Sequence, residues 1–88
     1  LRLQDGTVEL DGKSAALTRN ELRILQVLLE NRGRIVSRER LMQRLWESDS
    51  FVDGNTLTVN VTRLRKTLSS IVAEGLIVTK KGMGYLIP

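Results

Sequence analysis

The side chains best suited to chemistry lie in the segment Gly54–Ser69, and the chemistry they suggest is recognition of anions and bases. Its apolar residues recur at helical spacing and form one stripe that we expect to face a core: Leu57, Val61, Leu64 and Leu68. The opposite face combines small polar groups, one β-branched apolar residue and cations: Asn55, Thr56, Val59, Thr62, Arg63 and Lys66. The spacing therefore predicts an amphipathic helix with a cationic outer face.

This helix has no carboxylate, so its cations Arg63, Arg65 and Lys66 have no partner of opposite charge within the segment. An ordinary solvated helix intersperses Glu with Lys and gains i,i+4 pairs. Unneutralised cations beside hydroxyl groups and the methyl groups of Val59 suit the base edges and phosphates of a major groove. The alternative is a basic surface helix that only aids solubility.

The distribution of charge supports the same interpretation. The chain has 88 residues, enough for one small domain, and a formal net charge of +4. Residues 1–53 carry nine Lys/Arg and nine Asp/Glu, whereas residues 54–88 carry five Lys/Arg and a single acid, Glu74. The whole excess thus lies in the last part of the chain, as expected if one face of the fold meets a polyanion. A plain basic tail would lack the regular spacing of apolar and charged residues that this segment shows.

Catalysis and metal binding find no support in the composition. The chain has no cysteine and no histidine, so it lacks thiolate ligands, a disulfide framework and the commonest general base. Asp5 and Asp11 each precede a glycine and are expected to form turns. Asp49 and Asp53 lack the register of a calcium loop. We expect no enzyme activity, no metal and no cofactor.

No apolar run approaches the ~20 residues of a membrane span, and no signal peptide is visible. We therefore expect a soluble, cytoplasmic domain. The chain begins at Leu1 rather than at a methionine, so we expect it to be part of a longer protein.

The first half of the chain predicts a small antiparallel sheet followed by a helix. Residues 1–17 contain alternating apolar positions separated by two Asp-Gly pairs, with a short third strand expected at Ala15–Leu17. Thr18 and Glu21 have the spacing of a capping box, which predicts a helix that continues to about Asn31. Gly33 is available for a left-handed cap.

A second helix is predicted from Arg38, capped by Ser37, to about Trp46. Trp46 suits packing, although an indole N–H at an edge can also donate to a phosphate. An acidic connection, residues 47–53, precedes the cationic helix. After residues 69–75, the strands 76–79 and 85–87 flank residues 80–84, KKGMG, which predict a hairpin with a flexible cationic tip.

The order of elements is that of an α+β fold, a winged helix-turn-helix with an N-terminal antiparallel sheet, three helices and a C-terminal β-hairpin wing. The residues also resemble a known family, the effector domain of OmpR/PhoB-type bacterial response regulators. The resemblance is carried by LTRNELRILQVLLENRGRIVSRERLMQRLW at 17–46, VNVTRLRKTL at 59–68 and VTKKGMGYLI at 78–87. It implies one winged-helix DNA-binding domain over residues 1–88, a four-stranded N-terminal sheet, and a receiver domain outside this chain.

In that family the third helix lies in the major groove and the wing reaches the minor groove. Carried over by position, base and groove contacts fall on Thr56, Val59, Asn60 and Arg63. Contacts to phosphate fall on Thr62, Arg65, Lys66, Arg38, Trp46 and Thr79, and Lys81 is the minor-groove cation. Helical spacing alone places Asn60 and Arg65 nearer the flanks of the exposed face than its centre.

The resemblance also implies partners: double-stranded DNA with direct-repeat half-sites, a second copy bound head to tail as a homodimer, RNA polymerase through loop 47–53, and a sensor histidine kinase acting on the receiver domain.

Three features depart from the family pattern, namely Lys81 where arginine is usual, Thr62 where a further cation is frequent, and the acidity of loop 47–53. Residues 51–68 are similar to regulators that respond to antimicrobial peptides in Gram-positive bacteria. A rival function is a winged helix that binds only an acidic protein.

Overall fold

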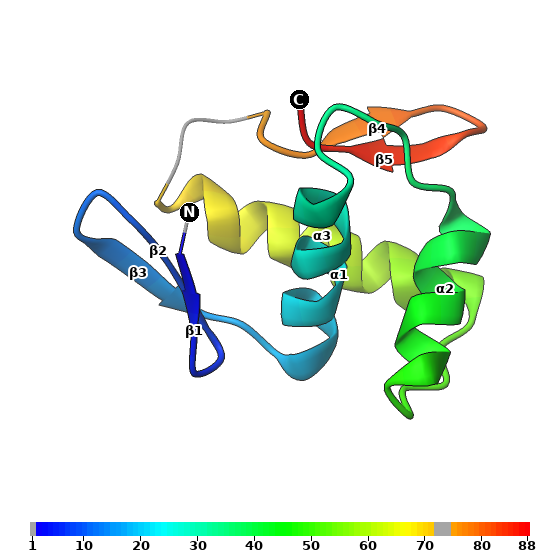
Figure 1. Ribbon diagram of the computed structural model, residues 1–88, viewed down its shortest axis with the longest axis horizontal. Coiled ribbons are helices and arrows are strands. Elements are labelled where there is room, and N and C mark those ends of the chain that lie inside the picture. The colour runs from blue at the N-terminus through cyan, green and yellow to red at the C-terminus, as the bar shows by residue number, and fades with distance from the viewer. Residues whose placement is uncertain (1, 72–74) are drawn as a thin grey trace.

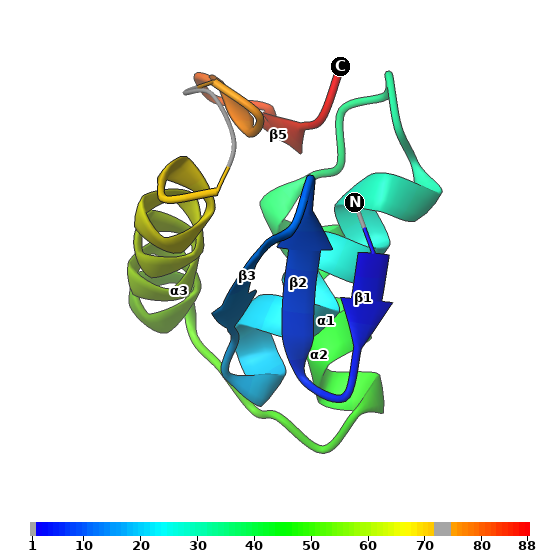
Figure 2. The same ribbon diagram turned by 90° about the vertical axis from the view of Figure 1, so that its left-hand side faces the viewer.

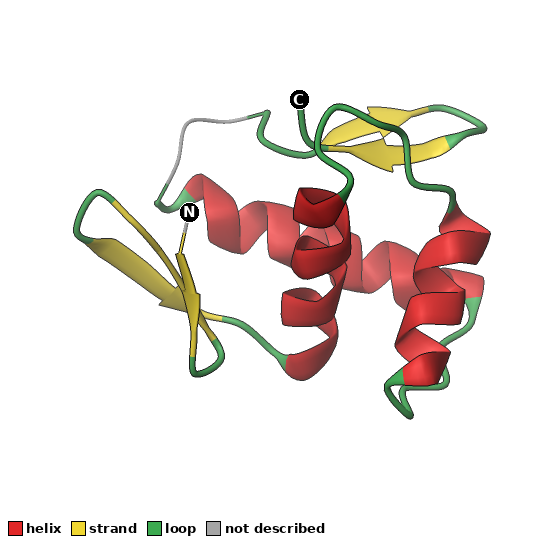
Figure 3. Cartoon of the chain, in the orientation of Figure 1, coloured by secondary structure: helices red, strands yellow, loops and turns green. Residues whose placement is uncertain are grey.

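The computed structural model describes residues 2–71 and 75–88, and it has the predicted order of elements (Figures 1 and 3). The helices and strands are β1 (Arg2–Gln4), β2 (Thr7–Leu10), β3 (Lys13–Ala16), α1 (Arg19–Glu30), α2 (Arg38–Glu47), α3 (Gly54–Ser69), β4 (Val78–Lys80) and β5 (Gly84–Leu86). The third strand begins two residues earlier than predicted, and the first wing strand begins two residues later. Leu1 and part of the connection expected at 69–75 lie outside the described residues.

The N-terminal sheet pairs its strands in the order β1-β2-β3, antiparallel throughout, as Figure 2 shows. Both Asp-Gly turns are confirmed, because Asp5, Gly6, Asp11 and Gly12 all have φ between 50° and 79°. The family resemblance implied four strands in this sheet. Among residues 2–71 and 75–88 it has three, since β1 and β3 form its two edges and no further described strand pairs with either.

Helix α1 is the centre of the fold and packs against both α2 and α3. Its predicted capping box is present: the Thr18 hydroxyl accepts from the Glu21 amide at 3.2 Å, and Glu21 Oε1 accepts from the Thr18 amide at 3.2 Å. Ile24, Leu25 and Leu28 are fully buried. Burial on several sides explains why so much of this short helix is apolar.

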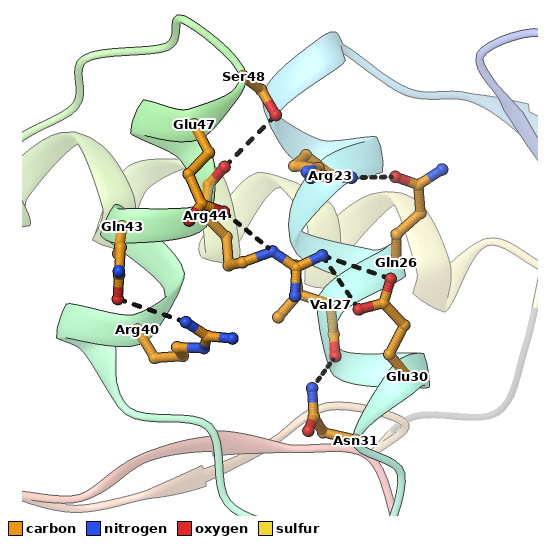
Figure 4. A network of polar contacts seen from close by, with 10 residues as sticks. All are labelled: Arg23, Gln26, Val27, Glu30, Asn31, Arg40, Gln43, Arg44, Glu47 and Ser48. Carbon is orange, nitrogen blue, oxygen red and sulfur yellow. Dashed lines mark hydrogen bonds and ion pairs between the residues drawn. The ribbon is translucent and has the colours of Figure 1, made fainter.

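A polar cluster joins the C-terminal end of α1 to the last turn of α2 (Figure 4). The Arg44 guanidinium lies 3.1 Å from the carboxylate of Glu30 on α1 and 3.6 Å from that of Glu47 on its own helix. Such half-exposed pairs contribute at most about 1 kcal/mol each. They orient α2 against α1 and leave most of the stabilisation to the apolar core.

The wing, β4 and β5, is attached to the segment between α1 and α2. Val36 forms an isolated antiparallel bridge with Tyr85, through backbone hydrogen bonds of 2.8 and 3.0 Å. The Gly33 amide donates to the Ile87 carbonyl at 2.7 Å, and the φ of 83° at Gly33 confirms the expected left-handed residue after α1. The wing therefore has a fixed base beside the start of α2 (Figure 1).

Candidate nucleic-acid interface

Helix α3 begins and ends where the sequence predicted, at Gly54 and Ser69. Asp53 caps it by accepting a 2.7 Å hydrogen bond from the Thr56 amide, and this bond lowers the pKa of the Asp53 carboxyl below its ordinary value. The predicted apolar stripe is buried in full: Leu57, Val61, Leu64 and Leu68. The opposite face of α3 is consequently turned away from the core.

That opposite face is exposed and keeps its cations unpaired. Thr56, Val59, Arg63 and Lys66 are all exposed, with Val59 at 46%. Within residues 2–71 and 75–88, Arg63 and Lys66 make neither an ion pair nor a side-chain hydrogen bond. Two cations without a partner among the described residues thus share one helix face with an exposed apolar side chain, which is the combination that reads a major groove.

Asn60 does not lie on this face. It is only 8% exposed, on the buried side of α3, because it stands three residues after Leu57 and four before Leu64. Its Nδ2 is buried and has no hydrogen-bond partner among the described residues. The expectation that Asn60 contributes to the exposed face is therefore corrected.

Two of the predicted phosphate donors on α3 already donate within the protein. The Thr62 hydroxyl donates to the Thr58 carbonyl at 2.9 Å, one turn earlier in the helix. Arg65 is half-buried, and its Nη2 donates to the hydroxyl of Thr79 in wing strand β4. Arg65 and Thr79, which the sequence suggested as separate contacts, are thus brought together.

Arg38 and Trp46 are likewise engaged within the fold. Arg38 donates from Nη1 to the Tyr85 hydroxyl at 2.9 Å and from Nη2 to the Gly54 carbonyl at 2.7 Å. Trp46 is 51% exposed, but its only polar hydrogen is donated to the Val52 carbonyl at 3.2 Å. In this arrangement the indole N–H is used within the protein, while the ring is half-exposed and lies outside the buried core.

The wing tip presents Lys80, Lys81 and Met83 to solvent, with Met83 61% exposed. The Met83 amide donates to the Lys80 carbonyl at 2.9 Å, and Gly82 has a φ of 74°, so the predicted flexible tip is a hydrogen-bonded turn. Sequence reasoning missed the exposure of Met83. Its position between two glycines in a turn was the available signal, because side chains at a hairpin tip usually face solvent.

The part of the chain that the structure describes contains no group of three or more His, Cys, Asp or Glu side chains arranged to hold a metal ion. Among the same residues, no helix is both long enough and apolar enough to cross a membrane. The features of this surface that bear on chemistry are therefore its cations, hydroxyl groups and exposed apolar side chains.

Comparison with known proteins places these features in a family. Residues 12–87 match the family model described as "Transcriptional regulatory protein, C terminal". The chain is 46% identical to the response regulator protein GraR of Staphylococcus epidermidis, over 98% of this chain and 42% of that protein. It is 47% identical to the sensory transduction protein BceR of Bacillus subtilis, over 94% of this chain and 36% of that protein. The chain thus spans less than half the length of these curated relatives.

Solved structures agree with the sequence relatives. The C-terminal domain of the nisin resistance regulator NsrR, described as a lantibiotic response regulator, superposes with a TM-score of 0.88 at 42% identity, over 97% of this chain and 87% of that one. The Klebsiella pneumoniae RstA DNA-binding domain, solved in complex with the RstA box, gives a TM-score of 0.74 at 31% identity, over 92% and 81% of the two chains. The chain therefore belongs to the C-terminal transcriptional regulatory domains, the winged-helix effector domains of OmpR/PhoB-type response regulators, and it is not an enzyme.

Proposed function

We propose that this domain binds double-stranded DNA in a sequence-specific manner, with α3 in the major groove and the wing tip at the neighbouring minor groove. The observation that carries the proposal is the exposed face of α3, where Arg63 and Lys66 have no partner within the described residues and Val59 is exposed between hydroxyl groups. The complex of RstA with its DNA, formed by a related domain of the same fold, supports the same role.

The residues of α3 divide into those that read bases and those that bind phosphate. Arg63 reads a guanine through O6 and N7, which gives roughly 1–3 kcal/mol of discrimination against other bases. Val59 packs on a thymine methyl group, and Thr56 contacts the groove at the start of the helix. Lys66 binds phosphate and fixes position without reading sequence.

The remaining proposed contacts surround this helix. Lys81 enters the minor groove, where a lysine is attracted without the planar fork of an arginine. Thr79 accepts from Arg65 and retains its own hydroxyl proton for a phosphate. Thr62 reaches a phosphate only after its hydroxyl rotates away from Thr58. Arg38 and Arg65 keep further N–H groups that can face phosphate.

We propose that the domain acts at the end of a longer response regulator in the cytoplasm, with a receiver domain that a sensor histidine kinase phosphorylates. The lengths and names of the curated relatives support this organisation. Two copies then bind direct-repeat half-sites head to tail as a homodimer, and joining two weak sites raises the apparent affinity strongly. The similarity to the lantibiotic response regulator NsrR supports a role in the response to antimicrobial peptides.

Loop 47–53 is the proposed contact for RNA polymerase. Phe51 is 81% exposed in it, while its neighbour Val52 is buried, so the aromatic ring projects from an anchored backbone. An exposed large apolar side chain of this kind is a feature of protein contacts. Acidic residues around Phe51 favour a basic partner surface.

The test of DNA binding uses duplexes that the wild-type domain selects from random sequence, compared with scrambled duplexes across a range of salt. Arg63→Ala should abolish the preference between the two, whereas Lys66→Ala should weaken both equally and lower the salt slope by about one. A wild-type domain that selects no sequence would contradict the proposal. Binding to an acidic protein alone would then explain the cationic face.

A further inference from the structure

Arg38 connects three elements of the interface through a single guanidinium group. It is the first residue of α2, its Nη1 donates to Tyr85 in wing strand β5 at 2.9 Å, and its Nη2 donates to the carbonyl of Gly54 at 2.7 Å. Gly54 is the first residue of α3. One side chain therefore links the wing to the start of the helix that carries the exposed cations.

A second arginine makes a similar link farther along the same helix. Arg65 of α3 donates to the hydroxyl of Thr79 in β4, the other strand of the wing. Gly54 and Arg65 lie about three turns apart, or about 16 Å along the helix axis. The wing is thus held to α3 at two separate points, one on each of its strands.

The wing needs such links because its own pairing is short. Each wing strand has three residues, and a two-stranded hairpin of this size is at best marginally stable without further contacts. The bridge between Val36 and Tyr85 fixes the wing to the segment before α2, and the buried side chains of Tyr85 and Ile87 anchor its base in the core. Hydrogen bonds from a charged guanidinium are among the stronger ones available to set the remaining orientation.

We propose that Arg38 is a positioning residue, which sets the separation between α3 and the wing so that both reach adjacent grooves of one duplex. Arg65 and Thr79 hold the same separation at the second point. This inference rests on the proposed DNA binding. It differs from a phosphate contact in one decisive respect: the effect of Arg38 passes through the Tyr85 hydroxyl, which carries no charge.

Tyr85→Phe is the primary test, because it removes the acceptor and leaves every charge in place. On a duplex selected from random sequence by the wild-type chain, we expect about fivefold weaker binding, with a salt slope that falls no further than it does in Lys81→Ala, because the wing contact is the one that is lost. The loss should disappear in a Lys81→Ala background, because that background has no Lys81 contact left for a displaced wing to lose. It should persist in full in an Arg63→Ala background, because α3 reads bases independently of the wing.

Arginine variants on α2 provide a matched control. Arg38→Lys keeps the charge, but one ammonium group cannot span both acceptors, so we expect the same loss as for Tyr85→Phe. Arg40→Lys changes an exposed arginine of the same helix, whose guanidinium bonds only to Gln43 among the described residues. This control should bind within twofold of wild type. Thr79→Val removes the second link, and the backbone order parameters of the wing tip rather than DNA affinity test it, because the Thr79 hydroxyl is also a proposed phosphate donor.

A measurement on the free domain separates this inference from the proposed function. Backbone amide order parameters at Lys81 and Gly82 should fall in Tyr85→Phe and stay unchanged in Arg40→Lys. The inference is wrong if these order parameters do not fall in Tyr85→Phe, or if Tyr85→Phe binds DNA within twofold of wild type. It is also wrong if the affinity loss of Tyr85→Phe adds fully to the affinity loss of Lys81→Ala. If wild type selects no DNA sequence, the proposed function fails and the order parameters still decide the positioning role. Should Tyr85→Phe not fold, Arg38→Lys and Thr79→Val decide the outcome.

Discussion

A Cβ atom placed on Gly84 would lie 2.1 Å from the carbonyl oxygen of Val36. This close approach is where the wing joins the segment before α2, and Gly84 also has a φ of 145°, which L side chains rarely adopt. We predict that Gly84→Ala lowers the free energy of unfolding by about 2–3 kcal/mol, because backbone must move on both sides of the contact. Thermal or urea unfolding measures the change.

Gly82→Ala is the control for this prediction. Gly82 has a φ of 74°, but a Cβ there would meet no atom within 4 Å. Its substitution should therefore cost only the backbone strain, about 1 kcal/mol. Equal costs for the two alanines would show that the contact with Val36 does not constrain the wing.

Asn60 offers a second prediction, because its buried Nδ2 has no hydrogen-bond partner among the described residues. Asn60→Leu removes the desolvation cost of that amide and extends the apolar stripe of α3. We expect the free energy of unfolding to rise by up to about 1 kcal/mol. DNA affinity should remain within about twofold of wild type, as follows from the position of Asn60 on the buried face. A specific loss of sequence preference would instead mean that Asn60 turns outward on DNA.

The stability of the domain should depend on pH through Asp53. Its hydrogen bond from the Thr56 amide lowers the folded-state pKa below the ordinary value of 3.8, so the carboxylate form is favoured in the folded state. This contribution is fully present above the unfolded-state pKa and is lost as the pH falls through the folded-state pKa. Thermal midpoints should therefore decline below about pH 4.

Two substitutions of Asp53 isolate this contribution. Asp53→Asn retains an oxygen that can cap α3 but does not titrate, so the difference from wild type should vanish below the folded-state pKa. Asp53→Ala removes the cap at every pH and should lower the midpoint even at pH 7. A wild type and an Asp53→Asn variant whose midpoints run parallel down to pH 2 would contradict the assignment.

Most of the fold was predictable because it depends on local patterns. The bounds of α3 followed from the spacing of Leu57 and its apolar neighbours, and the start of α1 followed from the capping box of Thr18. The Asp-Gly turns followed from their need for positive φ. Each of these signals lies within a few residues of the structure that it specifies.

The parts of the site that were missed depend on contacts between distant residues. Arg38 and Tyr85 are 47 positions apart, so no local pattern indicates that the guanidinium is held by the wing. The burial of Asn60 depends on how widely other elements cover α3, which periodicity alone does not define. Exposed cations such as Arg63 were predictable, because the absence of nearby carboxylates is visible in the sequence.

A substitution of Trp46 tests directly whether its indole N–H holds the loop or binds phosphate, because a single N–H serves one acceptor at a time. In the structure that acceptor is the carbonyl of Val52, so the bond spans loop 47–53 nearly from end to end. We predict that Trp46→Phe leaves DNA affinity and its salt slope within about twofold of wild type, while it speeds amide hydrogen exchange in loop 47–53. Phe51→Ala is the matched control, because Phe51 is 81% exposed in the same loop and should alter neither DNA binding nor loop exchange. A several-fold loss of DNA affinity in Trp46→Phe, with unchanged loop exchange, would place the indole N–H on a phosphate and would mean that the bond to Val52 opens when DNA binds.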